Sequence, residues 1–275
     1  MAQELHFESP SFGKRLKGML GVDFYRLFHT PMFYIFLAIA AIIPAMILGT
    51  MGMENPQTGV AAAPLYTNVW QIIAADTPLY VVSSIAEYAN MNMVFIFGGI
   101  MVSIFIGHDY RSGYVKQLFT THAKKQDYMM SKSITCAFAM ACMCITYLIG
   151  AVAAGLLTGI SFEVNVGSLI CAVLGKMLMS LGWASLYTFL NIIFRRHFGI
   201  SIASSFFFGT GILIIGAAAI LGNSSVLNLF LYGSSVFACL SSSFVTVLVC
   251  LVVSVVWAVI YNVLGTRILS KCDVY

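Results

Sequence analysis

The sequence predicts an all-α polytopic membrane protein with six transmembrane helices, an N-terminal amphipathic helix at the membrane surface, and cytoplasmic N- and C-termini. Of the 275 residues, 60% are hydrophobic and only 9% are charged, whereas a soluble domain carries roughly 25% charged residues. The apolar residues form long uncharged runs, and about 20 such residues cross the roughly 30 Å hydrocarbon core as a helix. The whole chain, 1–275, is therefore expected to form one transmembrane domain.

The first expected element is an amphipathic helix over residues 11–30, just before Pro31. Aromatic and aliphatic residues recur there near helical spacing, with basic residues among them. This pattern predicts a helix lying along the inner membrane surface. The residues that define it are Phe12, Leu16, Phe24, Arg26 and Leu27. The alternative is a solvated basic tail that serves only to orient the chain.

Six apolar runs follow and are expected to span the membrane. Their approximate bounds are 32–49, 90–107, 133–155, 168–194, 198–221 and 244–265. Each run is close to the length that a membrane-spanning helix needs. An even number of spans returns the C-terminus to the side of the N-terminus.

The basic residues support this count, because lysines and arginines near spans stay on the cytoplasmic side. With the N-terminus inside, the cytoplasmic segments hold Lys14, Arg15, Lys17, Arg26, Arg111, Lys116, Lys124, Lys125, Lys132, Arg195, Arg196, Arg267 and Lys271. The outer segments hold no lysine or arginine but contain Glu54, Asp76, Glu87 and Glu163. An odd number of spans would destroy this segregation. The net charge of +4 thus reflects orientation rather than a nucleic-acid surface.

Three connecting segments are long enough to have structure of their own. The cytoplasmic loop 108–132 exceeds a simple turn and is expected to contain short helices. The outer loop 50–89 is expected to form a cap with a short helix around 70–75. Segment 223–243 is uncharged and apolar but broken by Gly233 and serines, which predicts a re-entrant or interfacial piece. A plain outer loop is the alternative for this last segment.

Motifs for catalysis and metal binding are missing from the sequence. The five histidines are scattered, and the seven cysteines show no CxxC or Cys/His spacing. The GxxxxGK[ST] motif that cradles nucleotide phosphates is also missing. We therefore expect a chain that is not an enzyme and binds no cofactor, with any ATP and Mg²⁺ held by a separate subunit.

Lys176 is the one ionisable residue well inside an expected span, where an unpaired ammonium is costly. It is expected to line a water-filled pathway, to pair with Glu87 or Glu163, or to extend outward to the headgroups. The second and fifth spans have the polar, aromatic and small residues of a pathway wall. The cavity candidates are Asn92, Phe95, Ser103, Lys176, Ser204, Phe207 and Thr210. The alternative role of the small residues is close helix packing.

The stretch GHDYRSGYVKQLFTTHAKKQDYMMSKSI, residues 107–134, resembles the first cytoplasmic loop of type 2 ATP-binding-cassette (ABC) exporter permeases. Members of that family show an acid, a glycine followed by a basic position, a second basic cluster, and a lysine opening the third span. Asp109, Gly113, Lys116, Lys124 and Lys132 fill these roles here. The inner-surface helix, the six spans and the broken segment before the last span match the same family.

The resemblance implies a half-transporter that dimerises with itself or a related permease and recruits two P-loop ATPase subunits. The residues implied in coupling to the ATPase are Asp109, Tyr110, Arg111, Gly113, Tyr114, Lys116, Leu118 and Lys124. Small permeases of this kind resemble bacterial exporters, located in the cytoplasmic membrane, that move amphipathic peptides such as toxins or bacteriocins. The phenylalanines and methionines fit such cargo and other hydrophobic molecules equally.

The sequence is also compatible with two other classes of function. A channel or secondary transporter would work without an ATPase, although such proteins usually show intramembrane acids or inverted repeats. A structural or sensory membrane subunit would carry no cargo at all.

Overall fold

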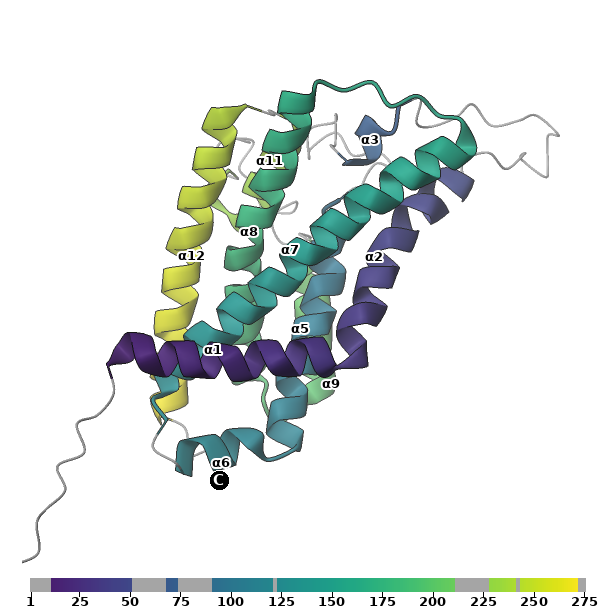
Figure 1. Ribbon diagram of the computed structural model, residues 1–275. Coiled ribbons are helices and arrows are strands. Elements are labelled where there is room, and N and C mark those ends of the chain that lie inside the picture. Colours follow the sequence, from purple (N-terminus) through teal and green to yellow (C-terminus); the bar gives the residue numbers. More distant parts are fainter. Residues whose placement is uncertain are drawn as a thin grey trace, which may run out of the picture.

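Ten helices account for nearly all of the chain that the structure describes. The computed structural model describes residues 11–50, 68–73, 91–120, 123–210, 228–240 and 243–271. The helices that run from one end of the molecule to the other are α2 (Pro31–Thr50), α5 (Met93–Arg111), α7 (Lys125–Thr158), α8 (Val166–Ile193) and α12 (Phe244–Lys271). They stand side by side as a bundle, with α7 crossing it obliquely (Figure 1).

These five helices are long and apolar enough to cross a membrane. They correspond to the first, second, third, fourth and sixth expected spans, so these predictions are confirmed. The fifth expected span begins as α9 (Phe198–Gly209), a shorter apolar helix. The rest of that run, from residue 211, lies outside the described residues. The predicted all-α polytopic fold with about six spans is confirmed.

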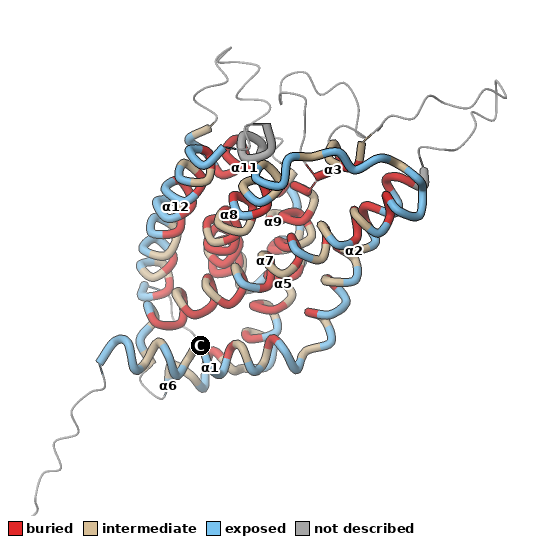
Figure 2. Tube along the Cα trace, turned by 45° about the horizontal axis from the view of Figure 1, so that its top comes forward, coloured by how far each residue is buried: buried red, intermediate tan, exposed pale blue. Residues whose placement is uncertain are grey.

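The bundle has an inner layer and an outer layer. Helices α5 and α8 are largely buried by their neighbours, whereas α2 and α12 bury one face and expose the other (Figure 2). The exposed side chains of α12 are mostly valines and leucines. Such a surface is unfavourable in water but suits lipid chains, as expected for a membrane-facing helix.

Helix α7 shows how closely the helices approach one another. Gly150 faces α2, and a Cβ atom at this position would lie 2.1 Å from the backbone oxygen of Ala41. A glycine is therefore required here, since even a methyl group would push the two helices apart. The 34 residues of α7 rise about 51 Å at 1.5 Å per residue, so the helix extends well beyond the hydrocarbon core on the inner side.

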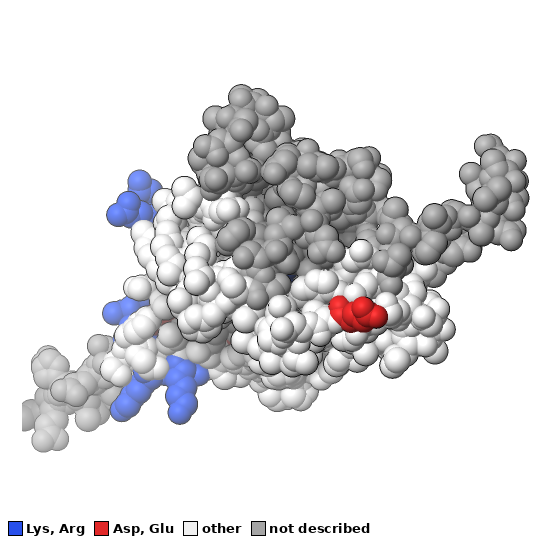
Figure 3. Space-filling model, turned by 90° about the horizontal axis from the view of Figure 1, so that it is seen from above, with Lys and Arg blue, Asp and Glu red and all other residues white. Residues whose placement is uncertain are grey.

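The outer end is capped by short segments. Helix α3 (Trp70–Ile73) lies beneath the α7–α8 connection, and the Tyr147 hydroxyl of α7 donates to the Ile72 oxygen at 3.1 Å. The expected short helix around 70–75 is therefore present over its described part. Seen from this end (Figure 3), the visible lysines and arginines lie along one side of the molecule, and a single acidic group lies on the face. Among the described outer residues, the acid is Glu163.

Helix α11 (Leu231–Leu240) occupies the described part of the expected segment 223–243. It packs against α8 and α12, and the Trp183 indole of α8 donates to the Ser235 hydroxyl at 2.9 Å. The segment therefore forms a short packed helix rather than a plain loop over these residues. Its predicted re-entrant or interfacial position stays a prediction.

Candidate functional site

Helix α1 (Phe12–His29) lies across the inner ends of the spans, nearly perpendicular to them (Figure 1). A helix is therefore present over the expected residues, whereas its position at the membrane surface stays a prediction. Its exposed face includes Val22, Tyr25 and Phe28. Its opposite face packs on α7 and buries Leu27 together with a carboxylate, Asp23. A fully buried acid on this face requires a cationic or hydrogen-bonding partner.

That partner is Lys132, in the first turns of α7. The Lys132 ammonium lies 2.6 Å from Asp23 Oδ1 and 2.6 Å from Asp109 Oδ2, and its side chain is 0% exposed. Asp109 is in the last turn of α5. The adjacent Ser131 hydroxyl donates to Asp23 Oδ2 at 2.6 Å. A single cation therefore joins three helices that are distant in sequence.

Arg26 of α1 completes the group by donating to Asp109 Oδ1. We refer to Asp23, Arg26, Asp109 and Lys132 as the inner ion cluster; its two carboxylates and two cations balance in charge. The Tyr128 hydroxyl also donates to Asp109 Oδ2, at 3.4 Å. Pairing of this kind is what allows charged groups to be buried.

The cluster also holds α6 (Tyr114–Thr120), the short helix in the loop between α5 and α7. The Arg26 guanidinium lies over the Tyr114 ring, 4.3 Å from its centroid. Burial lowers the pKa of Arg26, but Asp109 and Asp23 outweigh it, so this pKa is raised above its usual value. Burial and the Asp23 carboxylate raise the pKa of the Tyr114 hydroxyl. Arg26 is thus charged and Tyr114 neutral near pH 7, as a cation–π contact needs.

A second ion pair fixes the other end of α1. Arg15 Nε lies 2.7 Å from Asp127 Oδ2 in the first turn of α7, and the arginine is partly exposed. Together with the Asp23–Lys132 pair of the inner ion cluster, this pair fastens α1 to α7 at two points about two helical turns apart. Helices α1, α5, α6 and α7 are therefore linked to one another by side-chain contacts at this end of the bundle.

Within the described ranges, no group of three His, Cys, Asp or Glu side chains is placed to hold a metal ion. What the site offers is a junction of α1, α5 and α7 through buried ion pairs, next to the short, partly exposed helix α6.

A comparison with protein families finds that residues 20–218 match the model of the ABC-2 family transporter proteins. The match covers more than half of the chain and includes the inner ion cluster, α6 and the first five spans. The chain belongs to the ABC-2 transporter family. A comparison with curated proteins found no match. The chain is thus the permease subunit of a type 2 ABC transporter and a multi-pass membrane protein, and its family implies association with an ATPase component.

The structure divides the predicted coupling residues of this ABC-2 permease into two groups. Asp109 is 0% exposed and engaged by Lys132 and Arg26, so its carboxylate is not available to a partner in this conformation. The other residues are half-buried or exposed: Tyr110, Arg111, Gly113, Tyr114, Lys116, Leu118 and Lys124. The contact of these residues with an ATPase stays a prediction. A role of the buried Asp109 in coupling would be indirect, through the position of α5.

Sequence reasoning missed the pairing between Asp23 and Lys132. A signal was available, because Asp23 falls on the apolar face of the amphipathic helix, among Phe24, Leu27 and their neighbours. An acid at such a position is seldom solvated and points to a buried cation. The identity of that cation, 109 residues away, was not available from the spacing.

The predicted cavity residues of the second and fourth spans are buried within the chain. Lys176 is fully buried, donates to the Asn92 amide oxygen, and lies 5.7 Å from the centroid of the Phe95 ring. The expectation that it extends to the headgroups is therefore wrong for this conformation. Pairing with Glu163 is also wrong, since Glu163 is exposed and Lys176 forms no ion pair with any described residue. Glu87 lies outside the described residues.

The polar candidates of the second and fifth spans form hydrogen bonds within the chain, and those of Ser103 join different helices. The Ser103 hydroxyl of α5 lies 2.8 Å from the Ser205 hydroxyl of α9 and accepts from the Asn191 amide of α8 at 3.1 Å. Hydrogen bonds between spans of this kind stabilise helix association. Ser204 and Thr210 are half-buried and bond to backbone oxygens of α9 itself. Phe207 is exposed, so of the seven candidates it is the one that most clearly faces away from the protomer.

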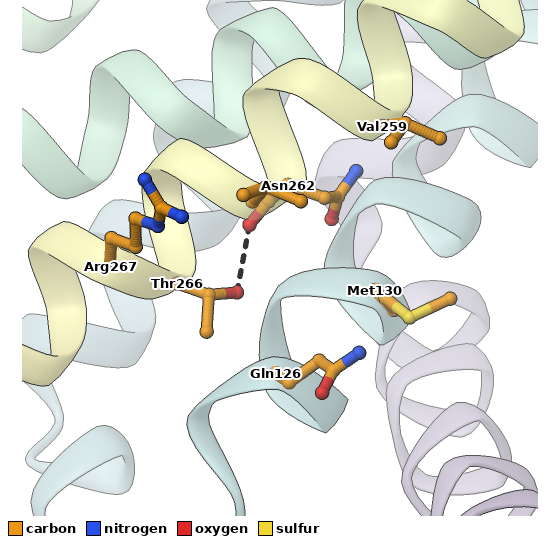
Figure 4. Close-up of a pocket in the computed structure, with 7 residues that line it drawn as sticks. Gln126, Met130, Val259, Asn262, Thr266 and Arg267 are labelled. Carbon is orange, nitrogen blue, oxygen red and sulfur yellow. Dashed lines mark hydrogen bonds between the residues drawn. The ribbon is translucent and has the colours of Figure 1, made fainter.

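A groove that the sequence did not indicate lies between α7 and α12 (Figure 4). Its volume is about 370 Å³, and its lining residues are Gln126, Met130, Val259, Asn262, Val263, Thr266 and Arg267. The Asn262 amide donates to the Ser185 hydroxyl at 3.2 Å and accepts from the Ser133 hydroxyl at 3.1 Å. Asn262 thus links α7, α8 and α12 at the wall of the groove.

Proposed function

We propose that this permease exports amphipathic peptides of the toxin or bacteriocin type, or other hydrophobic cargo, across a bacterial cytoplasmic membrane. A second copy of the chain, or a related permease, completes the transport pathway. Two P-loop ATPase subunits bind ATP and Mg²⁺ and supply the energy. This chain itself has no catalytic step, in keeping with the absence of a GxxxxGK[ST] motif from its sequence.

The observation that carries the proposal is the inner ion cluster. It joins α1, α5 and α7 through buried charges and places α6 against them by the Arg26–Tyr114 contact. An ATPase that pushes on α6 therefore acts on the inner end of α5, which continues into the protein core. Rigid-body movement of packed helices is a common way for such a push to open one side of a transporter.

The cargo assignment is supported by the exposed surface of α9. Phe206, Phe207 and Phe208 are all exposed on this helix, next to the polar packing that secures its other face to α5. A cluster of flexible or aromatic apolar side chains accepts large apolar molecules of varied shape. The same surface is available to a second protomer, which would enclose it within the dimer.

The test measures two quantities with the full-length chain. The first is the amount of ATPase that co-purifies with it, and the second is the stimulation of ATP hydrolysis by added peptides. Lys116 is exposed on α6, and Lys116→Glu reverses its charge without touching the inner ion cluster. We expect Lys116→Glu to lose most of the co-purified ATPase, while the matched reversal Lys271→Glu at the end of α12 retains it. Reconstituted complex is then assayed with amphipathic peptides and with a neutral soluble peptide.

Each outcome of this experiment contradicts a different part of the proposal. Recovery of no ATPase with the unmodified chain contradicts an ABC exporter. Recovery of an ATPase that no amphipathic peptide or hydrophobic drug stimulates contradicts the cargo assignment but leaves the permease role in place.

The buried lysine favours a second candidate, a channel or secondary transporter that works without an ATPase. Lys176 lies inside a span with Asn92 as its described polar partner, and intramembrane ionisable groups often mark ion pathways. Ion flux through the purified chain in vesicles without ATP is the result that would favour this candidate. The family membership favours the exporter.

A further inference from the structure

Three arginines surround a small pocket at the inner end of the molecule. Arg111 is the last residue of α5, and Arg195 and Arg196 form the turn between α8 and α9. The pocket has a volume of about 130 Å³, well below the roughly 300–1,000 Å³ of pockets that enclose a whole small molecule. It is large enough for one compact polar group.

None of these arginines forms an ion pair with a described residue. Every ion pair among the described residues belongs to Arg15, Arg26 or Lys132. Arg195 Nη1 is buried and has no hydrogen-bond partner within the described part of the chain. Such a donor is costly to bury without an acceptor. The Arg111 guanidinium lies over the Phe198 ring, 4.1 Å from its centroid, which holds it at the pocket without neutralising it.

The Asn191 and Ser201 side chains, which also line the pocket, already bond to other groups of the chain. The Asn191 amide donates to the Ser103 hydroxyl at 3.1 Å and to the Tyr187 oxygen at 2.8 Å, and its oxygen accepts from the Ser201 hydroxyl. The buried Arg195 Nη1 donor is paired with neither of them. Helix α9 begins here without a side-chain cap, and a helix N-terminus adds a further preference for an anion.

Guanidinium groups converging on a compact site match the several oxygens of a phosphate group. The surroundings indicate that this phosphate belongs to a lipid. Ile193 and Ile200 lie on either side of the arginine turn, and their side chains are 42% and 49% exposed. Many apolar side chains further along the spans are exposed too. An amphipathic ligand satisfies both surfaces, since its headgroup enters the pocket and its chains follow the helices.

We propose that Arg111, Arg195 and Arg196 form a binding site for the phosphate of an anionic inner-leaflet lipid. Anionic lipid in this pocket neutralises the junction between α5 and α9, and so stabilises the contact of the second and fifth spans at their inner ends. The site does not involve the cargo or Lys116, but Arg111 is also one of the predicted coupling residues, so Arg195 and Arg196 are the positions that test it.

The test measures lipid binding to the purified full-length chain by native mass spectrometry. The probes are phosphatidylglycerol and phosphatidylcholine with the same acyl chains. Removing one positive charge by Arg196→Gln is expected to weaken phosphatidylglycerol binding about fivefold, and Arg195→Gln/Arg196→Gln roughly 25-fold. Phosphatidylcholine binding stays unchanged in both variants. The control Lys271→Gln, at the inner end of α12, is expected to change either affinity less than about twofold.

Arg196 is exposed, so the single variant should fold, and its melting temperature verifies this. Equal affinity of the unmodified chain for the two lipids would overturn the proposal. Inorganic phosphate binding as tightly as phosphatidylglycerol would show a site for free phosphate instead. If Arg196→Gln left lipid binding intact but reduced ATPase recovery, the arginines would face acids on the partner protein, and the lipid site would be excluded.

Discussion

Removal of the central cation of the inner ion cluster is expected to release α1. In Lys132→Met the Asp23 carboxylate keeps the Ser131 hydroxyl as its described hydrogen-bond donor, and Asp109 keeps Arg26 and Tyr128. Removing one partner of a buried ion pair costs about 3–5 kcal/mol, because the remaining charge stays buried. At about 2–4 °C per kcal/mol, the melting temperature in detergent should fall by roughly 6–20 °C.

Tryptophan fluorescence during heating measures this fall, and limited trypsin digestion reports whether α1 has detached. Lys14→Met is the matched control, since Lys14 is exposed on α1 and its loss should cost less than about 0.5 kcal/mol. Adding Asp23→Asn to Lys132→Met removes the unpaired charge and should recover about 0.5–3 kcal/mol. A melting temperature within 2 °C of the unmodified chain, with α1 still resistant to trypsin, would refute the claim that the cluster holds α1.

Three further predictions concern single positions. Gly113 has φ +74° and open space around it. Gly113→Val should therefore impair ATPase stimulation through backbone strain of about 1–2 kcal/mol, whereas Gly113→Asn should retain stimulation. Equal loss of stimulation in both variants would show a side-chain effect instead. Lys176→Met should reduce transport while thermal stability changes by less than about 1.5 kcal/mol, since apolar replacement of a buried charge is often tolerated; lost expression with normal transport per molecule would contradict this. Gly150→Ala should destabilise the detergent-solubilised protein by about 1–3 kcal/mol because of the α2 backbone, whereas Gly13→Ala, which has open space, should be neutral or slightly stabilising.

The membrane-spanning helices could be predicted from the sequence because each depends on a local property. A run of about 20 apolar residues must be a helix in lipid, where every backbone group needs an internal partner. The inner ends of the helices were predicted less well. The polar segment Lys125–Lys132 was expected to belong to a loop, but it forms the first turns of α7. Nothing in a hydropathy pattern separates such an extension from a loop.

The candidate site could be predicted only in part. Asp109 and Lys132 were recognised as positions in a family-like loop, but their direct contact at 2.6 Å depends on how α5 and α7 pack. The third member, Asp23, lies 109 residues from Lys132, and one sequence contains no record of such distant pairings. Lys176 shows the same limit, because burial against Asn92 depends on the packing of α5 on α8.

The central claim is that α6, held by the inner ion cluster, is where an ATPase acts on this permease. Site-specific photo-crosslinking in intact membranes tests it most directly, with the photoreactive residue placed at Lys116 on α6 or at Glu163 in the outer loop. The account predicts a crosslink between position 116 and a P-loop ATPase, which ATP binding alters, and no such crosslink from position 163. A crosslink to the ATPase from position 163, or none from position 116 in a complex that hydrolyses ATP, would contradict it.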